Sequence, residues 1–152
     1  MAADGGPHGC YKPFALPLGG GAVQIYFADE TPYEKAKCAW QNISFVETAD
    51  GGKTWGEAKI AAYTPERRDG MPVVMDFGKW RYLAIEANPG KTRLHPQIVK
   101  CPMRGVSTPP GMVVGKDSML WNSLCPLGDD VFLLVSQVKG RITVYPGRVS
   151  GK

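Results

Sequence analysis

One unit recurs three times along the chain: an apolar strand, a glycine and a second strand-forming run. The first strands of the three units are Lys12–Gly19, Met71–Gly78 and Trp121–Gly128. Apolar residues precede each glycine by one position and by three positions; they are Leu18, Phe77, Leu127, Leu16, Met75 and Cys125. This period of two predicts strands, because side chains alternate between the two faces of a strand. The spacing of the glycines suits a four-stranded β-propeller blade and is too long for a leucine-rich or ankyrin repeat.

Eight further strands complete these units. They are expected at 23–27, 43–48, 58–63, 80–85, 97–101, 112–114, 131–135 and 141–145. We expect 31–39 to be a loop, because it contains Pro32 and has no apolar stripe. The third unit lacks a fourth strand.

The predicted fold is therefore all-β, a partial β-propeller of about three four-stranded antiparallel blades, half of a six-bladed ring. The blades span about 9–64, 68–115 and 117–149 and form one segment, and residues 1–8 are expected to be a flexible N-terminus. Three blades do not close a ring, and open blade faces would be adhesive. The chain is then part of a longer polypeptide, or two copies complete the ring as a homodimer, or another element covers the open sides.

Composition limits the class of protein and the kinds of partner to expect. The chain has 152 residues, of which 43% are apolar, enough for one domain with its own core. Its net charge of +4 comes from Lys and Arg spread along the chain without a basic run, so we do not expect nucleic-acid binding. No apolar stretch is long enough to span a membrane, and the first residues do not resemble a signal peptide.

The cysteines and histidines do not form a metal motif. Cys10, Cys38, Cys101 and Cys125 lie far apart, and no Cys-x-x-Cys pair occurs. We expect these cysteines to be small core residues, although an even number would also permit two disulfides in an oxidising compartment. His8 and His95 are not spaced as ligands. No metal and no cofactor are predicted.

The segment Thr48-Ala49-Asp50-Gly51-Gly52-Lys53-Thr54-Trp55 fits the Asp-box pattern at every position. It is expected to be a turn between the third and fourth strands of the first blade. Asp50 would accept backbone N–H groups, Gly51 and Gly52 would supply positive φ, and Trp55 would pack over the turn. Thr48, Asp50, Gly52, Thr54 and Trp55 are therefore assigned a structural role.

With this box, the repeated strands and the segment Arg67-Arg68-Asp69-Gly70-Met71-Pro72, the chain resembles the sialidase-like propeller superfamily, in particular its exo-arabinanase branch. The resemblance implies a glycan-binding site at the central funnel, with two carboxylates for hydrolysis. Glu86 matches the family's Glu after the apolar strand. Where relatives carry Tyr-Glu-Pro, this chain reads Tyr11-Lys12-Pro13. The resemblance also implies an extracellular enzyme, but the compartment stays open.

Glu86 and Lys12 are candidates from that resemblance, and the other candidates are polar or aromatic residues near strand ends and loops. The catalytic candidates are Glu86 and Asp69, and the sugar-binding candidates are Arg68, Lys12, Asp29, Gln41 and Trp40. Glu30, Asn42 and Tyr33 are further candidates, whereas Tyr26 and Trp80 are expected in the core. Two functions remain: a glycoside-hydrolase-like segment acting on glycans, whose activity Lys12 argues against, and a non-catalytic carbohydrate-binding or assembly module that completes its ring by homodimerisation.

Overall fold

The structure is a computed structural model and describes residues 9–36, 40–77, 80–88, 95–102, 112–113 and 119–149. Side chains are described for these residues except 34–36, 95–102, 112–113 and 119. The described residues form eleven strands and one short 3-10 helix, η1 (Thr31–Ala36). The predicted number of strands is confirmed in this part of the chain.

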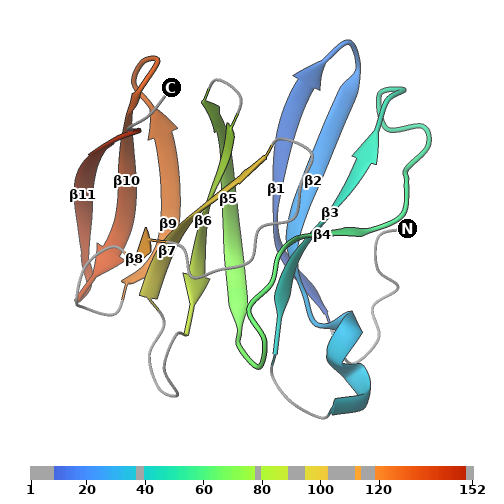
Figure 1. Cartoon of the computed structure of the whole chain (residues 1–152), viewed down its shortest axis with the longest axis horizontal. Helices are drawn as coiled ribbons and strands as arrows, with labels where there is room; N and C mark the ends of the chain where they lie inside the picture. The colour runs from blue at the N-terminus through green and yellow to red at the C-terminus, as the bar shows by residue number, and fades with distance from the viewer. Residues whose placement is uncertain are drawn as a thin grey trace.

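The strands form three antiparallel sheets that stand side by side, here called blades 1 to 3 (Figure 1). Blade 1 contains β1 (Cys10–Gly19), β2 (Ala22–Asp29), β3 (Asn42–Thr48) and β4 (Lys59–Ala62). Blade 2 contains β5 (Asp69–Phe77), β6 (Trp80–Ala87), β7 (His95–Pro102) and β8 (Met112–Val113). Blade 3 contains β9 (Met119–Pro126), β10 (Val131–Val138) and β11 (Arg141–Arg148). The all-β class and the partial propeller are confirmed, and blade 3 has three strands among the described residues.

Turns lie at two of the three glycines where the sequence predicts them. β1 ends at Gly19, and Gly128 lies in the turn between β9 and β10. Gly78 lies outside the described residues. The turn between β10 and β11 has positive φ at both Lys139 and Gly140, the geometry that matches the twist of a two-residue hairpin.

The expected loop at 31–39 is wrong at its start, because Thr31–Ala36 forms η1. Asp29 Oδ1 accepts hydrogen bonds from the Thr31 backbone N (3.0 Å) and hydroxyl (2.6 Å), which fixes the chain at the start of the helix. Pro32 fits the first turn, where its missing N–H has no helical partner in any case.

The blades pack through alternate residues of their strands. One face of blade 1 meets blade 2 in a buried apolar cluster; its members are Tyr26, Ala28, Ile43, Ala61, Ala62, Val74, Leu83, Ile85 and Ala87. The opposite face of blade 2 meets blade 3 in a second cluster; its members are Met75, Phe77, Tyr82, Ala84, Leu124, Phe132 and Leu134. Blade 2 is therefore apolar on both faces, as expected of a sheet covered on both sides. Tyr26 is in the core as predicted, and Trp80 packs at its margin.

A buried polar network also joins blades 1 and 2. Arg81 binds Asp76 with two bonds, Nε to Oδ1 (2.6 Å) and Nη2 to Oδ2 (2.7 Å). Its Nη1 donates across the blade interface to the Tyr26 hydroxyl (2.7 Å) and to Gln24 Oε1. Burial acts to lower the pKa of Arg81. The hydrogen bonds and charge of Asp76, together with Tyr26, outweigh this effect and raise the pKa above its ordinary value.

The turn between β3 and β4 has the expected geometry. Asp50 accepts hydrogen bonds from the backbone N of Lys53 and Thr54 (both 2.9 Å) and from the Thr54 hydroxyl (2.6 Å). These bonds, with the Thr54 hydroxyl first, hold the pKa of Asp50 well below its ordinary value. Gly51 and Gly52 have positive φ. Trp55 lies over Gly52, since a Cβ added there would be 3.6 Å from its ring.

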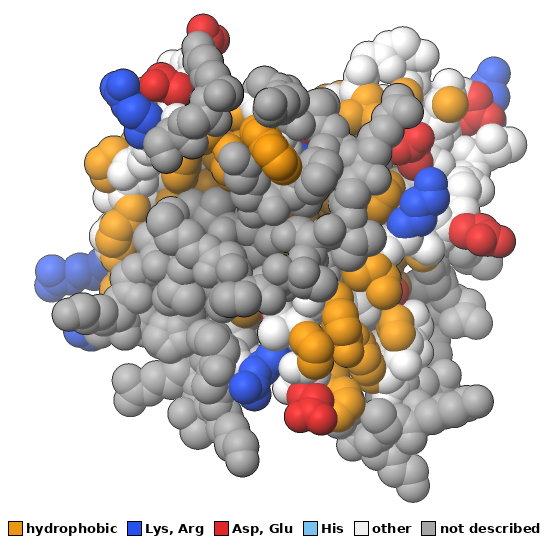
Figure 2. Space-filling view, viewed as in Figure 1, with side chains coloured by type: hydrophobic (Ala, Val, Ile, Leu, Met, Phe, Trp, Pro, Cys, Tyr) orange, Lys and Arg blue, Asp and Glu red, His pale blue; other side chains and the backbone are white. Residues whose placement is uncertain are grey.

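On the face shown in Figure 2, Lys and Arg side chains are scattered among Asp and Glu and do not gather in one patch. Within the described residues, no helix has the length and apolar character needed to cross a membrane.

The cysteine prediction is wrong for Cys125, which is exposed, while Cys10 is half-buried. The side chains of Cys38 and Cys101 lie outside the described residues. Burial, with the nearby charges of Asp29 and Glu30, raises the pKa of Cys10 to about 11. Since the thiolate is the reactive form, burial suppresses reaction at Cys10.

We therefore expect iodoacetamide at pH 8 to alkylate Cys125 at least tenfold faster than Cys10 in the native protein, since a thiol with a pKa raised by about 2 is about 100-fold less ionised there. Peptide mass mapping after timed quenching measures both sites in one sample. Reaction in urea is the control, and both cysteines should then react at similar rates. Equal rates in the native protein would contradict the described burial of Cys10.

Candidate functional site

The innermost strands of the three blades carry the same irregularity at the same place. The pairing register shifts between Tyr11 and Phe14 in β1 and between Gly70 and Val73 in β5. In β9 it shifts opposite Val135 and Gln137 of β10. These are β-bulges, which redirect side chains.

Each bulge holds one residue other than glycine at positive φ: Lys12 (51°), Met71 (55°) and Trp121 (58°). These three residues are the first residues of the three repeated sequence segments. Such backbone conformations cost about 1–3 kcal/mol each and persist where the surrounding structure imposes them, often at functional sites. Pro13 and Pro72 follow the first two, which is consistent with a position that donates no ladder hydrogen bond.

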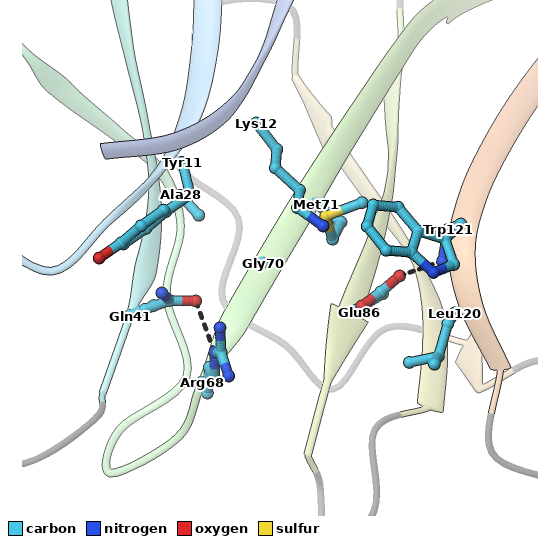
Figure 3. Close-up of a pocket in the computed structure, with 10 residues that line it drawn as sticks. All are labelled: Tyr11, Lys12, Ala28, Gln41, Arg68, Gly70, Met71, Glu86, Leu120 and Trp121. Atoms are coloured by element: carbon cyan, nitrogen blue, oxygen red, sulfur yellow. Dashed lines mark hydrogen bonds between the residues drawn. The ribbon is translucent and has the colours of Figure 1, made fainter. Parts of the chain in front are cut away.

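The three bulges meet at one pocket of about 240 Å³ (Figure 3). Its lining consists of one pair of residues from each inner strand and four residues from neighbouring segments. These are Tyr11, Lys12, Gly70, Met71, Leu120, Trp121, Ala28, Gln41, Arg68 and Glu86. The volume is just below the range of about 300–1,000 Å³ that is usual for small-molecule sites.

Glu86 is the one carboxylate in this lining among the described residues. It lies opposite Gly70 in the β5–β6 pair, and Ala28 occupies the equivalent place in blade 1, opposite Tyr11. The Glu86 side chain is buried, and its Oε1 accepts a hydrogen bond from the Trp121 backbone N. Burial raises the pKa of Glu86, while this hydrogen bond and the charges of Lys12 and Arg68 oppose the rise. The carboxyl group therefore keeps its proton to a higher pH than an exposed Glu does.

Arg68 is held at the pocket by Gln41. Arg68 Nε donates to Gln41 Oε1 (2.9 Å), and Gln41 Nε2 donates to Glu30 Oε1 (2.6 Å). The backbone N of Arg68 donates to Asn88 Oδ1 (2.8 Å). A side chain at Gly70 would crowd this arrangement, since a Cβ there would lie 3.2 Å from Gln41 Oε1. Gln41 thus orients the arginine.

Trp121 and Lys12 are in contact at the pocket. The Trp121 side chain is 58% exposed, and Lys12 Nζ lies 3.3 Å from the centroid of its ring, a cation–π contact. Trp121 was not among the site residues predicted from the sequence. A signal was available: Trp121 occupies the same repeat position as Lys12, which had been selected.

The structure brings together four of the seven predicted catalytic and binding residues, namely Glu86, Arg68, Lys12 and Gln41. The other three do not line the pocket. Asp29 is buried, and its two oxygens accept hydrogen bonds from Thr31 and from the Ser44 hydroxyl (2.9 Å). Trp40 packs edge-on against Tyr33, with ring centroids 6.0 Å apart.

Asp69 is fully buried beside Thr64, and neither carboxylate oxygen makes a hydrogen bond of ordinary geometry within the described residues. Burial raises the pKa of Asp69 to about 6, although the Thr64 hydroxyl and backbone N–H lie close enough to oppose the shift. Asp69 is therefore a buried acid that does not line the pocket, although its neighbours Arg68 and Gly70 do.

The described residues contain no group of three or more His, Cys, Asp or Glu that would hold a metal ion. The pocket therefore combines an acid held toward its protonated form, an arginine fork, a lysine and an exposed indole. Such a set can donate hydrogen bonds to hydroxyl or carboxylate oxygens and present an apolar ring to a ligand.

No family model matches the chain, and no curated protein sequence matches it. Among solved structures, it is similar to the Hadza microbial sialidase Hz136, with a TM-score of 0.68 and 14% identity over 95% of this chain and 32% of that one. It is also similar to the α-L-arabinofuranosidase Arb93A of Fusarium graminearum bound to an iminosugar inhibitor, with a TM-score of 0.55 and 12% identity over 93% and 58%. The same enzyme class bound to arabinobiose gives a TM-score of 0.54 at 13% identity.

These similarities define the class of fold. Sialidase and GH93 arabinofuranosidase are both propeller glycoside hydrolases, and the resemblance inferred from the sequence is confirmed at the level of the fold. The chain spans about a third of the sialidase and somewhat more than half of the arabinofuranosidase. It therefore has the fold of part of a sialidase-like β-propeller.

Proposed function

We propose that this chain is a glycoside-hydrolase-like propeller segment that binds a sugar residue of a glycan in the inner-strand pocket, with Glu86 as its acid. The observation that carries the proposal is the convergence of the three bulges on one pocket. Strained backbone that recurs at equivalent positions and opens onto a single pocket is a mark of a functional site. The turn containing Asp50 would be a structural Asp box outside this site.

Each lining group has a role in this proposal. The Trp121 indole offers an apolar ring to a sugar face, and Arg68 donates to sugar oxygens through its planar fork. A Glu86 carboxyl that keeps its proton has the form that a general acid needs to protonate a departing glycosidic oxygen. The similar structures are those of enzymes named for sialic acid and arabinofuranose, so these sugars are the first to test.

One observation favours a second candidate, a non-catalytic sugar-binding module. Hydrolysis by the usual schemes requires two carboxylates, and the described lining supplies only Glu86. Lys12 stands at the equivalent bulge of blade 1 and cannot act as that second carboxylate. Binding without turnover would select this candidate.

The experiment measures binding by calorimetry with methyl α-L-arabinofuranoside and N-acetylneuraminic acid, and hydrolysis with the p-nitrophenyl arabinofuranoside and the methylumbelliferyl sialoside. Trp121→Ala should weaken binding about tenfold, or about 1.4 kcal/mol, through loss of ring stacking. Glu86→Gln should keep binding within about threefold and lower any hydrolysis at least 100-fold, the usual contribution of a general acid.

The matched control is Trp55→Ala, because this tryptophan is also exposed but lies in the Asp50 turn. It should leave binding unchanged. The proposal fails if no sugar binds, or if Trp55→Ala weakens binding as much as Trp121→Ala does.

A further inference from the structure

Lys12 occupies one face of the Trp121 indole. Its Nζ lies 3.3 Å from the ring centroid, and both residues line the pocket. Figure 3 shows the Lys12 side chain extending from β1 toward the ring, on the side where Arg68 and Gln41 also lie. The charge of Lys12 also acts on Glu86, where it opposes the rise of the pKa. The ammonium group therefore lies within the pocket, near both the indole and the acid.

A sugar and the Lys12 ammonium cannot use this face of the indole at the same time. The carbon atoms of a stacked sugar would lie about 3.5–4.0 Å from those of the indole. The ammonium already stands at that height, 3.3 Å above the ring centroid. With the Lys12 side chain in place the pocket volume is about 240 Å³, just below the usual range of about 300–1,000 Å³. Movement of this side chain out of the pocket enlarges it toward that range.

The contact between Lys12 and Trp121 can be exchanged for a ligand at small cost. Trp121 is 58% exposed, and Lys12 is exposed as well. A cation–π contact at an exposed site changes an equilibrium by about two- to fivefold. The backbone at both residues is fixed by the bulges, whereas the ammonium group sits on a flexible four-carbon stem. Rotation of the Lys12 side chain is therefore enough to uncover the ring.

We propose that Lys12 is an intramolecular occupant of the sugar site, and that a sugar stacks on Trp121 only after the Lys12 ammonium has left the ring. The inference rests on the proposed function, since it concerns the same pocket. It gives Lys12 an effect on affinity opposite to that of the sugar-binding role predicted from the sequence. Lys12 competes with the sugar for the indole, so its removal strengthens binding.

The test measures binding by calorimetry with two uncharged probes, methyl α-L-arabinofuranoside and N-acetylneuraminic acid methyl ester, so that no ligand carboxylate pairs with Lys12. Lys12→Ala should tighten binding about two- to fivefold. Lys12→Arg should bind as the wild type does, because a guanidinium also stacks on an indole. The matched control is Lys139→Ala, since Lys139 is also an exposed lysine at positive φ (50°) but lies in the β10–β11 turn. This control should leave the affinity unchanged.

Two further measurements separate competition for the ring from a structural effect of Lys12. In the Trp121→Ala background, Lys12→Ala should no longer change the affinity, because the contested ring is absent. In the free wild type, NMR should show a nuclear Overhauser effect between the Lys12 ε protons and the Trp121 ring protons. This signal should disappear when the protein is saturated with the probe that binds.

Weaker or unchanged binding by Lys12→Ala overturns the inference, because Lys12 is then a sugar ligand or plays no part. An Overhauser effect that persists at saturation also overturns it, since the sugar then uses the other face of the ring. Binding of N-acetylneuraminic acid, with neither uncharged probe bound by Lys12→Ala, refutes the inference but leaves the proposed function intact. Failure of the wild type and of every variant to bind any of the three sugars refutes both.

Discussion

Replacing Arg81 by Met should lower the free energy of unfolding by about 3–5 kcal/mol, the cost of leaving one partner of a buried ion pair without the other. The Arg81 side chain is 4% exposed and that of Asp76 is 26% exposed. The substitution strands the Asp76 carboxylate and removes the donor that joins the Tyr26 hydroxyl and Gln24 across the blade interface. Urea unfolding at pH 7 measures the loss.

Arg148→Met is the matched control for this substitution. Arg148 also pairs with an aspartate, Asp130 at 3.3 Å, but the two side chains are 72% and 38% exposed. Exposed ion pairs contribute about 0–1 kcal/mol, so this variant should differ little from the wild type. Similar losses in the two variants would contradict the assignment of Arg81 as the polar link between blades 1 and 2.

Asp69→Asn should be more stable than the wild type at pH 7 and should remove part of the pH dependence of unfolding. The folded pKa of Asp69, about 6, lies above its ordinary value of 3.8, so folding favours the protonated acid. The stabilisation of the folded state by protonated Asp69 is fully present below about pH 4 and is lost as the pH rises through 6. The difference of about two pKa units corresponds to about 3 kcal/mol.

Unfolding curves between pH 4 and pH 7 test this expectation. The difference in unfolding free energy between Asp69→Asn and the wild type should move in favour of the variant by about 2–3 kcal/mol over that interval, because the amide is never charged. Asp129→Asn, in the exposed turn of blade 3, should follow the wild-type curve. A constant difference between Asp69→Asn and the wild type would mean that Asp69 does not titrate as a buried acid.

Much of the fold could be predicted from the sequence because its signals are local. The period of two and the turn glycines lie within each strand pair, and they predicted eleven strands in three sheets. The 3-10 helix was missed although its signal is also local: Asp29 stands two residues before Thr31 and caps it. The absence of an apolar stripe was given too much weight in a helix of six residues.

The site could be predicted only in part, because its residues depend on how the blades pack. The family resemblance selected Lys12 and Glu86, and both line the pocket. Asp69 and Asp29 were selected as polar residues near strand ends. No local pattern shows that Asp69 is buried without a hydrogen bond of ordinary geometry, or that Asp29 caps a helix. Trp121 would have been found by applying the repeat alignment to every residue of the bulge.

The expectation for Cys125 failed for a related reason. At this repeat position Met75 is buried in the second cluster and Leu16 packs against the first, because another blade covers that face of blades 1 and 2. Sequence alignment predicts the face of the sheet on which a residue lies, whereas its burial depends on what covers that face. Cys125 is exposed because no described residue covers the face of blade 3 on which it lies.

The proposed sugar site lies where the bulges at Lys12, Met71 and Trp121 meet. Its most direct test is a titration with methyl α-L-arabinofuranoside and N-acetylneuraminic acid that follows the tryptophan indole N–H signals by NMR, assigned with Trp121→Phe and Trp55→Phe. We expect the Trp121 signal to shift and saturate with one of these sugars while the Trp55 signal stays in place. A Trp121 signal unmoved by either sugar, or a Trp55 signal that moves equally, would contradict the proposed site.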